Sequence, residues 1–130
     1  MAELMETMTV VRTEPGGSWA DAARTIDLVH LARMTLGDRG LEREVLQLFA
    51  RQSVQLVERM RTAPPDAVAM LAHTLKGSAR GIGACRVAAA ADVVERASAG
   101  TGPGLPAALA TLAEAVEDAR SVVGELLRTQ

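Results

Sequence analysis

One short segment, residues 73–80, combines a titratable ring, two cations and a glycine at helical spacing. Positions i, i+3, i+4 and i+7 share one face of a helix, and here they are held by His73, Lys76, Gly77 and Arg80. Histidine can act as a covalent nucleophile. A phosphoryl group on it adds negative charge, which Lys76 and Arg80 are placed to neutralise. An exposed histidine is often only a surface residue, so the neighbours carry this hypothesis.

Two neighbours of His73, Gly77 and Lys76, are residue types whose presence at these positions requires an explanation. A glycine inside a helix costs about 1 kcal/mol relative to alanine. Helical side chains lean toward the N-terminus, so a side chain at 77 would cover His73, and its absence lets a partner surface approach. Lys76 is the only lysine among 14 basic residues, and a compact ammonium suits a phosphoryl group. The alternatives are that Gly77 begins helix termination and that Lys76 is a solvated charge.

Apolar spacing predicts that helices position this segment. We expect them near residues 26–36, 41–61, 66–80, 85–97 and 106–127, with glycine- or proline-containing turns between them. No segment alternates with the period of a strand. The fold class is therefore predicted to be all-α, an antiparallel up-down four-helix bundle with a short leading N-terminal helix. Residues 1–24 are expected to form a flexible N-terminal tail, and residues 25–130 the bundle domain.

The expected core follows from the same periodicity. In the long second helix the apolar stripe is Val45, Leu48, Phe49, Leu56 and Met60. Cys85, the only cysteine, is interpreted as a small buried hydrophobic residue. The second histidine, His30, is interpreted as structural or exposed because no carboxylate or cysteine lies at ligand spacing.

The segment Ala72–Ala79, followed by Gly83-Ala84 and later by Val94-Glu95, resembles the signature of histidine-containing phosphotransfer (HPt) domains. The likeness covers roughly residues 26–127, and Leu36-Gly37-Asp38 is similar to the earlier part of the family pattern. In that family the histidine accepts a phosphoryl group from an aspartyl phosphate on a receiver domain. The histidine then passes the group to another receiver.

The resemblance implies a role for each matching residue. His73 would be the phosphoacceptor, usually through Nε2, with Lys76 as the phosphate-side cation and Gly77 as the clearance residue. Mg²⁺ would belong to the partner receiver, so no cofactor is expected on this chain. The sequence departs from many members at Ala88–Ala91, where they carry Leu or Cys, and this should affect packing more than chemistry.

Counting from the turn at Gly83-Ala84 points to a further residue. His73 lies ten residues before Gly83, and Val94 lies ten residues after Ala84, so antiparallel helices place Val94 and Glu95 level with His73. Val94 fits the buried stripe, which leaves Glu95 at its edge. In the family a Gln or Glu near this place bonds the other imidazole nitrogen, and we expect Glu95 to accept from Nδ1–H. The alternative is a solvated Glu95 that pairs with Arg96 or another neighbour.

Composition excludes several other classes. A chain of 130 residues suits one domain, and a net charge of -2 with 2% aromatic residues weighs against nucleic-acid binding. No apolar run approaches a membrane span, and Met1–Thr9 lacks the basic region of a signal peptide. No cluster of metal ligands and no nucleotide-binding glycine pattern is present. We therefore expect a cytoplasmic protein, a monomer, with no ATP site of its own.

These observations predict a phosphocarrier of a two-component phosphorelay, with a transient phosphohistidine rather than enzymatic turnover. Its expected partners are receiver domains of response regulators or hybrid histidine kinases. Two alternatives remain: a dimerisation-type helical module of a histidine kinase, and a helical adaptor that is never phosphorylated. In the kinase module an acidic residue usually follows the histidine, whereas here Thr74 does.

Overall fold

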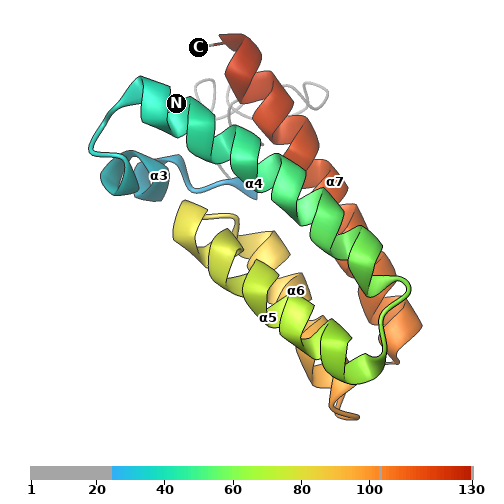
Figure 1. Cartoon of the computed structure of the whole chain (residues 1–130). Coiled ribbons are helices and arrows are strands. Elements are labelled where there is room, and N and C mark those ends of the chain that lie inside the picture. The colour runs from blue at the N-terminus through green and yellow to red at the C-terminus, as the bar shows by residue number, and fades with distance from the viewer. Residues whose placement is uncertain (1–24, 103, 130) are drawn as a thin grey trace, which may run out of the picture.

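The computed structural model describes residues 25–102 and 104–129, so the tail expected at residues 1–24 lies outside it. The described residues form five helices and no strand (Figure 1). The helices are α3 (Leu28–Met34), α4 (Arg39–Met60), α5 (Pro65–Ile82), α6 (Cys85–Ser98) and α7 (Leu105–Thr129). The all-α fold class is therefore confirmed, and the four longer helices lie where the apolar periodicity predicts them.

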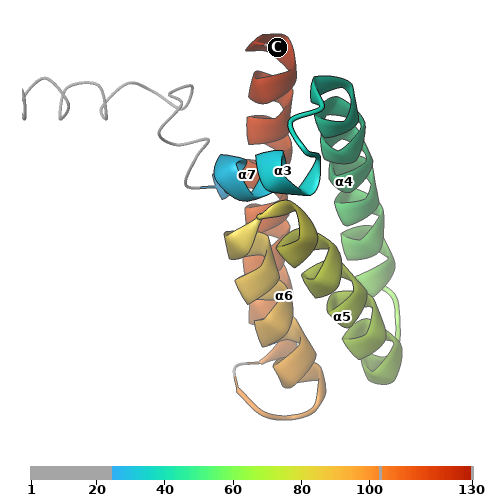
Figure 2. The same ribbon diagram turned by 90° about the vertical axis from the view of Figure 1, so that its left-hand side faces the viewer.

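The four long helices pack side by side around one core. Helix α4 contacts α5 and α7, and α6 also contacts α5 and α7, with α5 and α6 forming the most extensive pair. The short helix α3 lies across one end of the bundle, where it contacts α5 (Figures 1 and 2). Each long helix thus has two long neighbours, and α5 and α6 together present one outer face of the bundle.

Small residues let α5 and α6 approach closely. Ala72 and Ala79 on α5, and Ala91 on α6, are completely buried beside Leu75 and Val94. Close packing of this kind fixes the register of two helices, because side chains of other sizes would leave a cavity or a clash. The contact between α5 and α6 is therefore rigid enough to hold side chains on their shared outer face in a defined relation.

The predicted core stripe of α4 contains one error. Phe49, Leu56 and Met60 are buried as predicted, but Leu48 is 57% exposed. The buried positions of α4 are Leu46, Phe49, Ser53, Leu56, Val57 and Met60. A residue at 48 is rotated by about 100° from 49 on the helix, which turns it out of this stripe. Ser53 satisfies its hydroxyl inside the core by donating to the Phe49 carbonyl at 2.8 Å.

The leading helix α3 is shorter than predicted. A capping residue fixes where it begins, and residues with positive φ follow its end. The Asp27 carboxylate accepts from the His30 N–H at 3.0 Å, which caps the helix at its start. Leu36 and Gly37 have φ values of 54° and 76°, and left-handed residues end a helix. Residues 26, 27, 35 and 36 of the predicted helix therefore lie outside it.

The turn between α5 and α6 depends on Gly83. Its φ is 84°, and a Cβ at this position would lie 2.9 Å from Asp27 Cβ, so only glycine fits. The Asp27 N–H donates to the Gly83 carbonyl at 2.8 Å, and His30 Nε2 lies 3.0 Å from the Gly81 carbonyl oxygen. These contacts hold the segment before α3 against the turn. The contact with Gly81 gives His30 a structural role, one of the two interpretations drawn from the sequence.

The prediction that Cys85 is buried is also wrong. The residue is exposed, and its Sγ lies 3.7 Å from the Gly83 carbonyl. Cys85 is the first residue of α6, where the buried face begins only with Val87 and Ala88. A small apolar side chain was expected to turn inward, but the helix phase set by the later residues turns it outward.

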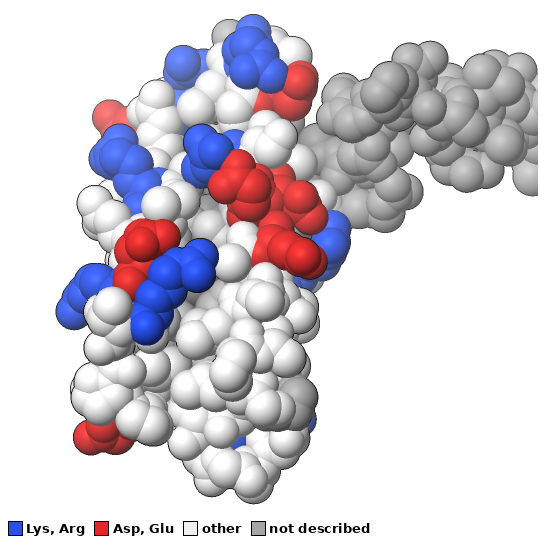
Figure 3. Space-filling model, turned by 90° about the vertical axis from the view of Figure 1, so that its right-hand side faces the viewer, with Lys and Arg blue, Asp and Glu red and all other residues white. Residues whose placement is uncertain are grey.

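On the face formed largely by α7, charged side chains of both signs gather over the upper half, with acidic groups side by side near the centre, and the lower half is mostly uncharged (Figure 3). Within the described residues, three ion pairs involve this helix: Arg120 with Glu117, Arg128 with Glu125, and Arg86 of α6 with Asp118. Exposed pairs of this kind add little stability. Among the described helices, none combines the length and the apolar character that a membrane crossing requires.

Candidate functional site

His73 projects from α5 on the face opposite the core. Its neighbours Ala72 and Leu75 are completely buried, which turns position 73 outward, and its side chain is 69% exposed. One ring nitrogen, Nδ1, lies 3.1 Å from Glu95 Oε2 on α6. Within residues 25–102 and 104–129, Nε2 makes no hydrogen bond, so it is the nitrogen open to an approaching partner.

Glu95 uses its two oxygens for two different partners. Oε2 contacts His73 Nδ1, whereas Oε1, which is withdrawn from solvent, lies 2.7 Å from Lys76 Nζ. The hydrogen bond with Lys76 is the main cause that lowers the pKa of the Glu95 carboxyl, and the bond with His73 acts in the same direction. Glu95 is therefore a charged acceptor that can hold a proton on Nδ1 and leave the Nε2 lone pair free.

The Lys76 ammonium is surrounded mainly by carboxylates and has little contact with solvent. Its side chain is only 13% exposed, and Nζ lies 3.1 Å from Asp92 Oδ1 in addition to its contact with Glu95. Hydrogen bonds to Glu95 and then Asp92 raise the pKa of the Lys76 ammonium. The hydrogen bond from Lys76 is also the main cause that lowers the pKa of Asp92. The ammonium is therefore charged and already paired.

Gly77 leaves open space beside His73. Apart from the adjoining residues and the nearby backbone of α5 itself, no atom lies within 4 Å of the place where a Cβ at this position would stand. Packing inside the chain therefore does not require glycine here, in contrast to Gly83. Gly77 also lies within α5 rather than at its end, so helix termination does not explain it.

Of the residues singled out from the sequence, the structure brings His73, Lys76 and Glu95 together and places Gly77 beside them. Arg80 is exposed on the same helix but, within the described parts of the chain, makes no hydrogen bond or ion pair with these side chains. Asp92 was missed. It could have been found from the same count about the turn, because Lys76 and Asp92 lie seven residues before Gly83 and eight after Ala84.

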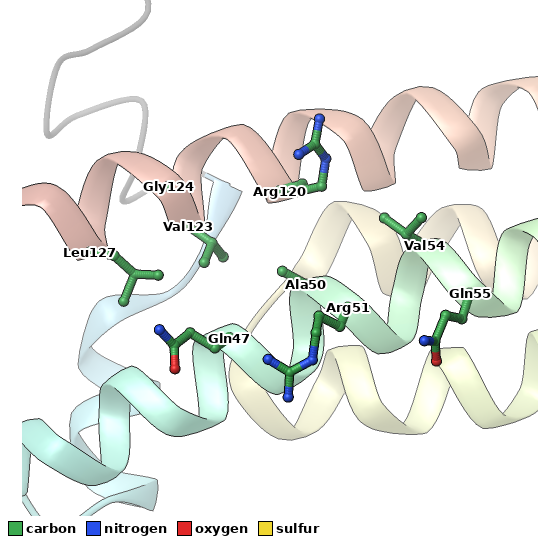
Figure 4. Close-up of a pocket in the computed structure, with 9 residues that line it drawn as sticks. All are labelled: Gln47, Ala50, Arg51, Val54, Gln55, Arg120, Val123, Gly124 and Leu127. Carbon is green, nitrogen blue, oxygen red and sulfur yellow. The ribbon is translucent and has the colours of Figure 1, made fainter.

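Two of the surface grooves of the described residues differ in their relation to this cluster: one lies between α4 and α7, and the other includes Asp92. A groove of about 600 Å³ between α4 and α7 is lined by apolar side chains, two glutamines and two arginines, but no histidine, cysteine or carboxylate (Figure 4). A groove of about 480 Å³ near the α5–α6 turn includes Arg80, Cys85 and Asp92. Among the described residues, no group of three His, Cys, Asp or Glu side chains is arranged to hold a metal ion.

A comparison with known protein families matches the part of the chain that contains this cluster. Residues 44–122 match the Hpt domain family, which is more than half of the chain. The chain therefore belongs to the Hpt domain family, whose role is phosphotransfer in two-component signalling. The match spans the cluster on α5 and α6. No curated protein gives a significant match to the chain.

The charge cluster makes the stability of the protein depend on pH in a defined way. Because the folded pKa values of Asp92 and Glu95 are lowered, their contribution to stability is present above the ordinary carboxyl pKa of about 4 and is lost as the pH falls further. Lys76→Met removes this contribution. We expect the variant to unfold more easily than the wild type at neutral pH, and the difference to shrink below about pH 4.

Urea unfolding at a series of pH values measures this difference. Arg61→Met is the matched control, because it breaks an ion pair with Glu58 in which both side chains are more than half exposed, and such pairs contribute little. A Lys76→Met difference that stays constant from neutral to acidic pH would contradict the assignment of the cluster.

Proposed function

We propose that His73 is the phosphoacceptor of a two-component phosphorelay. It takes a phosphoryl group from an aspartyl phosphate on one receiver domain and passes it to another. The observation that carries the proposal is an exposed imidazole whose Nδ1 is held by Glu95 while Nε2 faces solvent. A surface histidine with no such partner would have no fixed tautomer and no fixed direction of attack.

The transfer step uses the Nε2 lone pair. Nε2 forms a bond to phosphorus as the bond from phosphorus to the acyl oxygen breaks, and that electron pair stays on the receiver carboxylate. The ring gains positive charge during the attack because Nδ1 keeps its proton. The Glu95 carboxylate at 3.1 Å compensates this charge. The reverse reaction, onto a second receiver, follows the same path backwards.

Cations near His73 complete the proposed site. Lys76 is the phosphate-side cation, one turn along α5 from His73, and it reaches the phosphoryl group by exchanging part of its present pairing. Arg80 is assigned a more distant electrostatic role because it lies two turns away with no ion pair to the cluster. The receiver, rather than this chain, supplies Mg²⁺.

Docking uses the face of α5 around His73. Met70, one turn before His73, is 72% exposed, and an exposed large apolar side chain beside a reactive group is typical of a contact surface. Gly77, one turn after His73, keeps the opposite side of the ring clear. The proposed partners are receiver domains of response regulators or hybrid histidine kinases.

The finer description of the molecule belongs to the same proposal. Helices α4 to α7 form an antiparallel up-down bundle within residues 25–130, with α3 as the leading helix. The protein acts in the cytoplasm as a monomer, as a carrier rather than a turnover enzyme. Its phosphohistidine is transient.

Phosphoryl transfer from an isolated receiver domain tests the function. The receiver is loaded with radiolabelled acetyl phosphate, freed of the reagent and mixed with this protein. We expect label on this chain that is labile in acid and stable in base, as a phosphoramidate is, and we expect none on His73→Gln. Label that persists in His73→Gln means that another residue is the acceptor.

The same experiment separates the alternatives. A helical adaptor gives no label with any receiver. A dimerisation-type kinase module sediments as a tight dimer, whereas the proposed carrier sediments as a monomer at the concentrations used for transfer.

Gly77 gives a second prediction, in which stability and function move in opposite directions. Gly77→Leu should leave the protein as stable as the wild type or up to about 1 kcal/mol more stable, because leucine is the better helix former and the space for its Cβ is open. The transfer rate should fall about tenfold or more, which corresponds to about 1.4 kcal/mol of activation free energy. Urea unfolding and rapid-quench transfer measure the two effects.

Ala107→Leu is the matched control, since it adds the same side chain at an exposed position of α7, away from His73. Its transfer rate should equal that of the wild type. A normal rate in Gly77→Leu would show that residue 77 lies outside the contact with the receiver.

A further inference from the structure

Asp92 holds the same ammonium as Glu95. It lies one turn before Glu95 on α6, and its Oδ1 accepts from Lys76 Nζ at 3.1 Å, while Glu95 Oε1 lies 2.7 Å from the same nitrogen. Two carboxylates therefore share one cation. Lys76 is largely withdrawn from water, so these carboxylates rather than solvent account for most of its surroundings.

Asp92 is itself held in place from the other side. Arg96 Nε donates to Asp92 Oδ2 at 3.1 Å, so each oxygen of Asp92 has a different basic partner. The Arg96 side chain is more than half exposed, and it is one turn along α6 from Asp92. The result is a chain of alternating charges that runs from Arg96 through Asp92, Lys76 and Glu95 to the His73 ring.

We propose that Asp92 is a positioning residue that restrains the Lys76 ammonium and thereby sets the equilibrium of phosphoryl exchange between His73 and a receiver aspartate. The inference rests on the proposed function of His73. It assigns to Asp92 a role that neither the sequence pattern nor the family match gives it.

The physical reason is competition for one cation. An ammonium has three N–H donors, and two carboxylates already attract it here. A phosphoryl group on Nε2 adds about 1.5 to 2 negative charges, and Lys76 on its flexible stem is the nearest cation in sequence that can turn toward it. As long as the Lys76 ammonium pairs with Asp92, it pairs less fully with the phosphoryl group on His73.

This competition acts on only one side of the exchange. When the N–P bond forms and the acyl P–O bond breaks, the negative charge moves from the receiver to the neighbourhood of Lys76. Asp92 therefore destabilises the phosphohistidine relative to the aspartyl phosphate, which favours onward transfer. Arg96 opposes this effect by pairing with Asp92 from the far side.

The test compares Asp92→Asn with the wild type in exchange with an isolated receiver domain loaded from radiolabelled acetyl phosphate. The ratio of base-stable to base-labile label reports phosphohistidine against aspartyl phosphate. We expect the ratio to rise about threefold to fivefold in Asp92→Asn, the range expected for one partly screened charge pair. Asp92→Glu should restore most of the wild-type ratio. Glu58→Gln, the same charge change at an exposed pair on α4, should leave the ratio unchanged.

Arg96→Gln provides a second variant at an exposed position. It frees Asp92 to pair more fully with Lys76, so the ratio should fall below that of the wild type. A general loss of structure would instead move both variants in the same direction.

A phosphate-independent measurement accompanies the exchange. Lys76 is the only lysine of the chain, so its acetylation by acetic anhydride is read from one peptide by mass spectrometry. The initial rate should be higher in Asp92→Asn and lower in Arg96→Gln.

The outcomes separate this inference from the proposed function. If the wild type carries label on His73 but Asp92→Asn has the wild-type ratio and the wild-type acetylation rate, Asp92 has no restraining role and the function stands. If the wild type takes no label at all, the phosphoacceptor assignment fails and the inference about exchange fails with it.

Discussion

The bridge made by the Glu95 carboxylate is the interaction on which the site depends. One oxygen faces the Lys76 ammonium at 2.7 Å and the other faces His73 Nδ1 at 3.1 Å. Lys76 keeps this carboxylate charged, as the lowered pKa of Glu95 reflects, and a charged carboxylate is a strong acceptor for an imidazole N–H. The buried cation thus acts on the exposed nucleophile through a third group, rather than only through space.

This bridge requires a fixed register between α5 and α6. Gly83 provides it at the turn, where its positive φ and its close approach to Asp27 allow no other residue. Fully buried alanines on both helices accompany the extensive contact between α5 and α6. Asp27 and the first turn of α3 are joined to the end of α5 by the hydrogen bonds of Asp27 and His30. Elements that perform no chemistry therefore determine whether His73, Lys76 and Glu95 meet.

Much of this arrangement is predictable from local rules. The spacing of His73, Lys76 and Gly77 needs only the helical period, and Glu95 follows from counting residues on both sides of the turn. The pairing of Lys76 does not follow from spacing, because it depends on which way a long flexible side chain turns. The count about the turn could have placed Asp92 level with Lys76, but only the structure shows that the ammonium contacts it. Within the described residues, Arg80, which shares the helix face, makes no hydrogen bond or ion pair with the cluster. Leu48 was placed in the core by apolar spacing and Cys85 by residue type, whereas the helix phase set by their neighbours turns both side chains outward.

The tautomer of His73 tests the central claim most directly. Long-range ¹H–¹⁵N NMR of the ¹⁵N-labelled protein, recorded well above the usual histidine pKa of about 6.5, distinguishes a ring protonated on Nδ1 from one protonated on Nε2. The account predicts that His73 carries its proton on Nδ1 and shifts toward the Nε2–H form in Glu95→Ala. A wild-type ring protonated mainly on Nε2 would leave no lone pair facing solvent and would contradict the account.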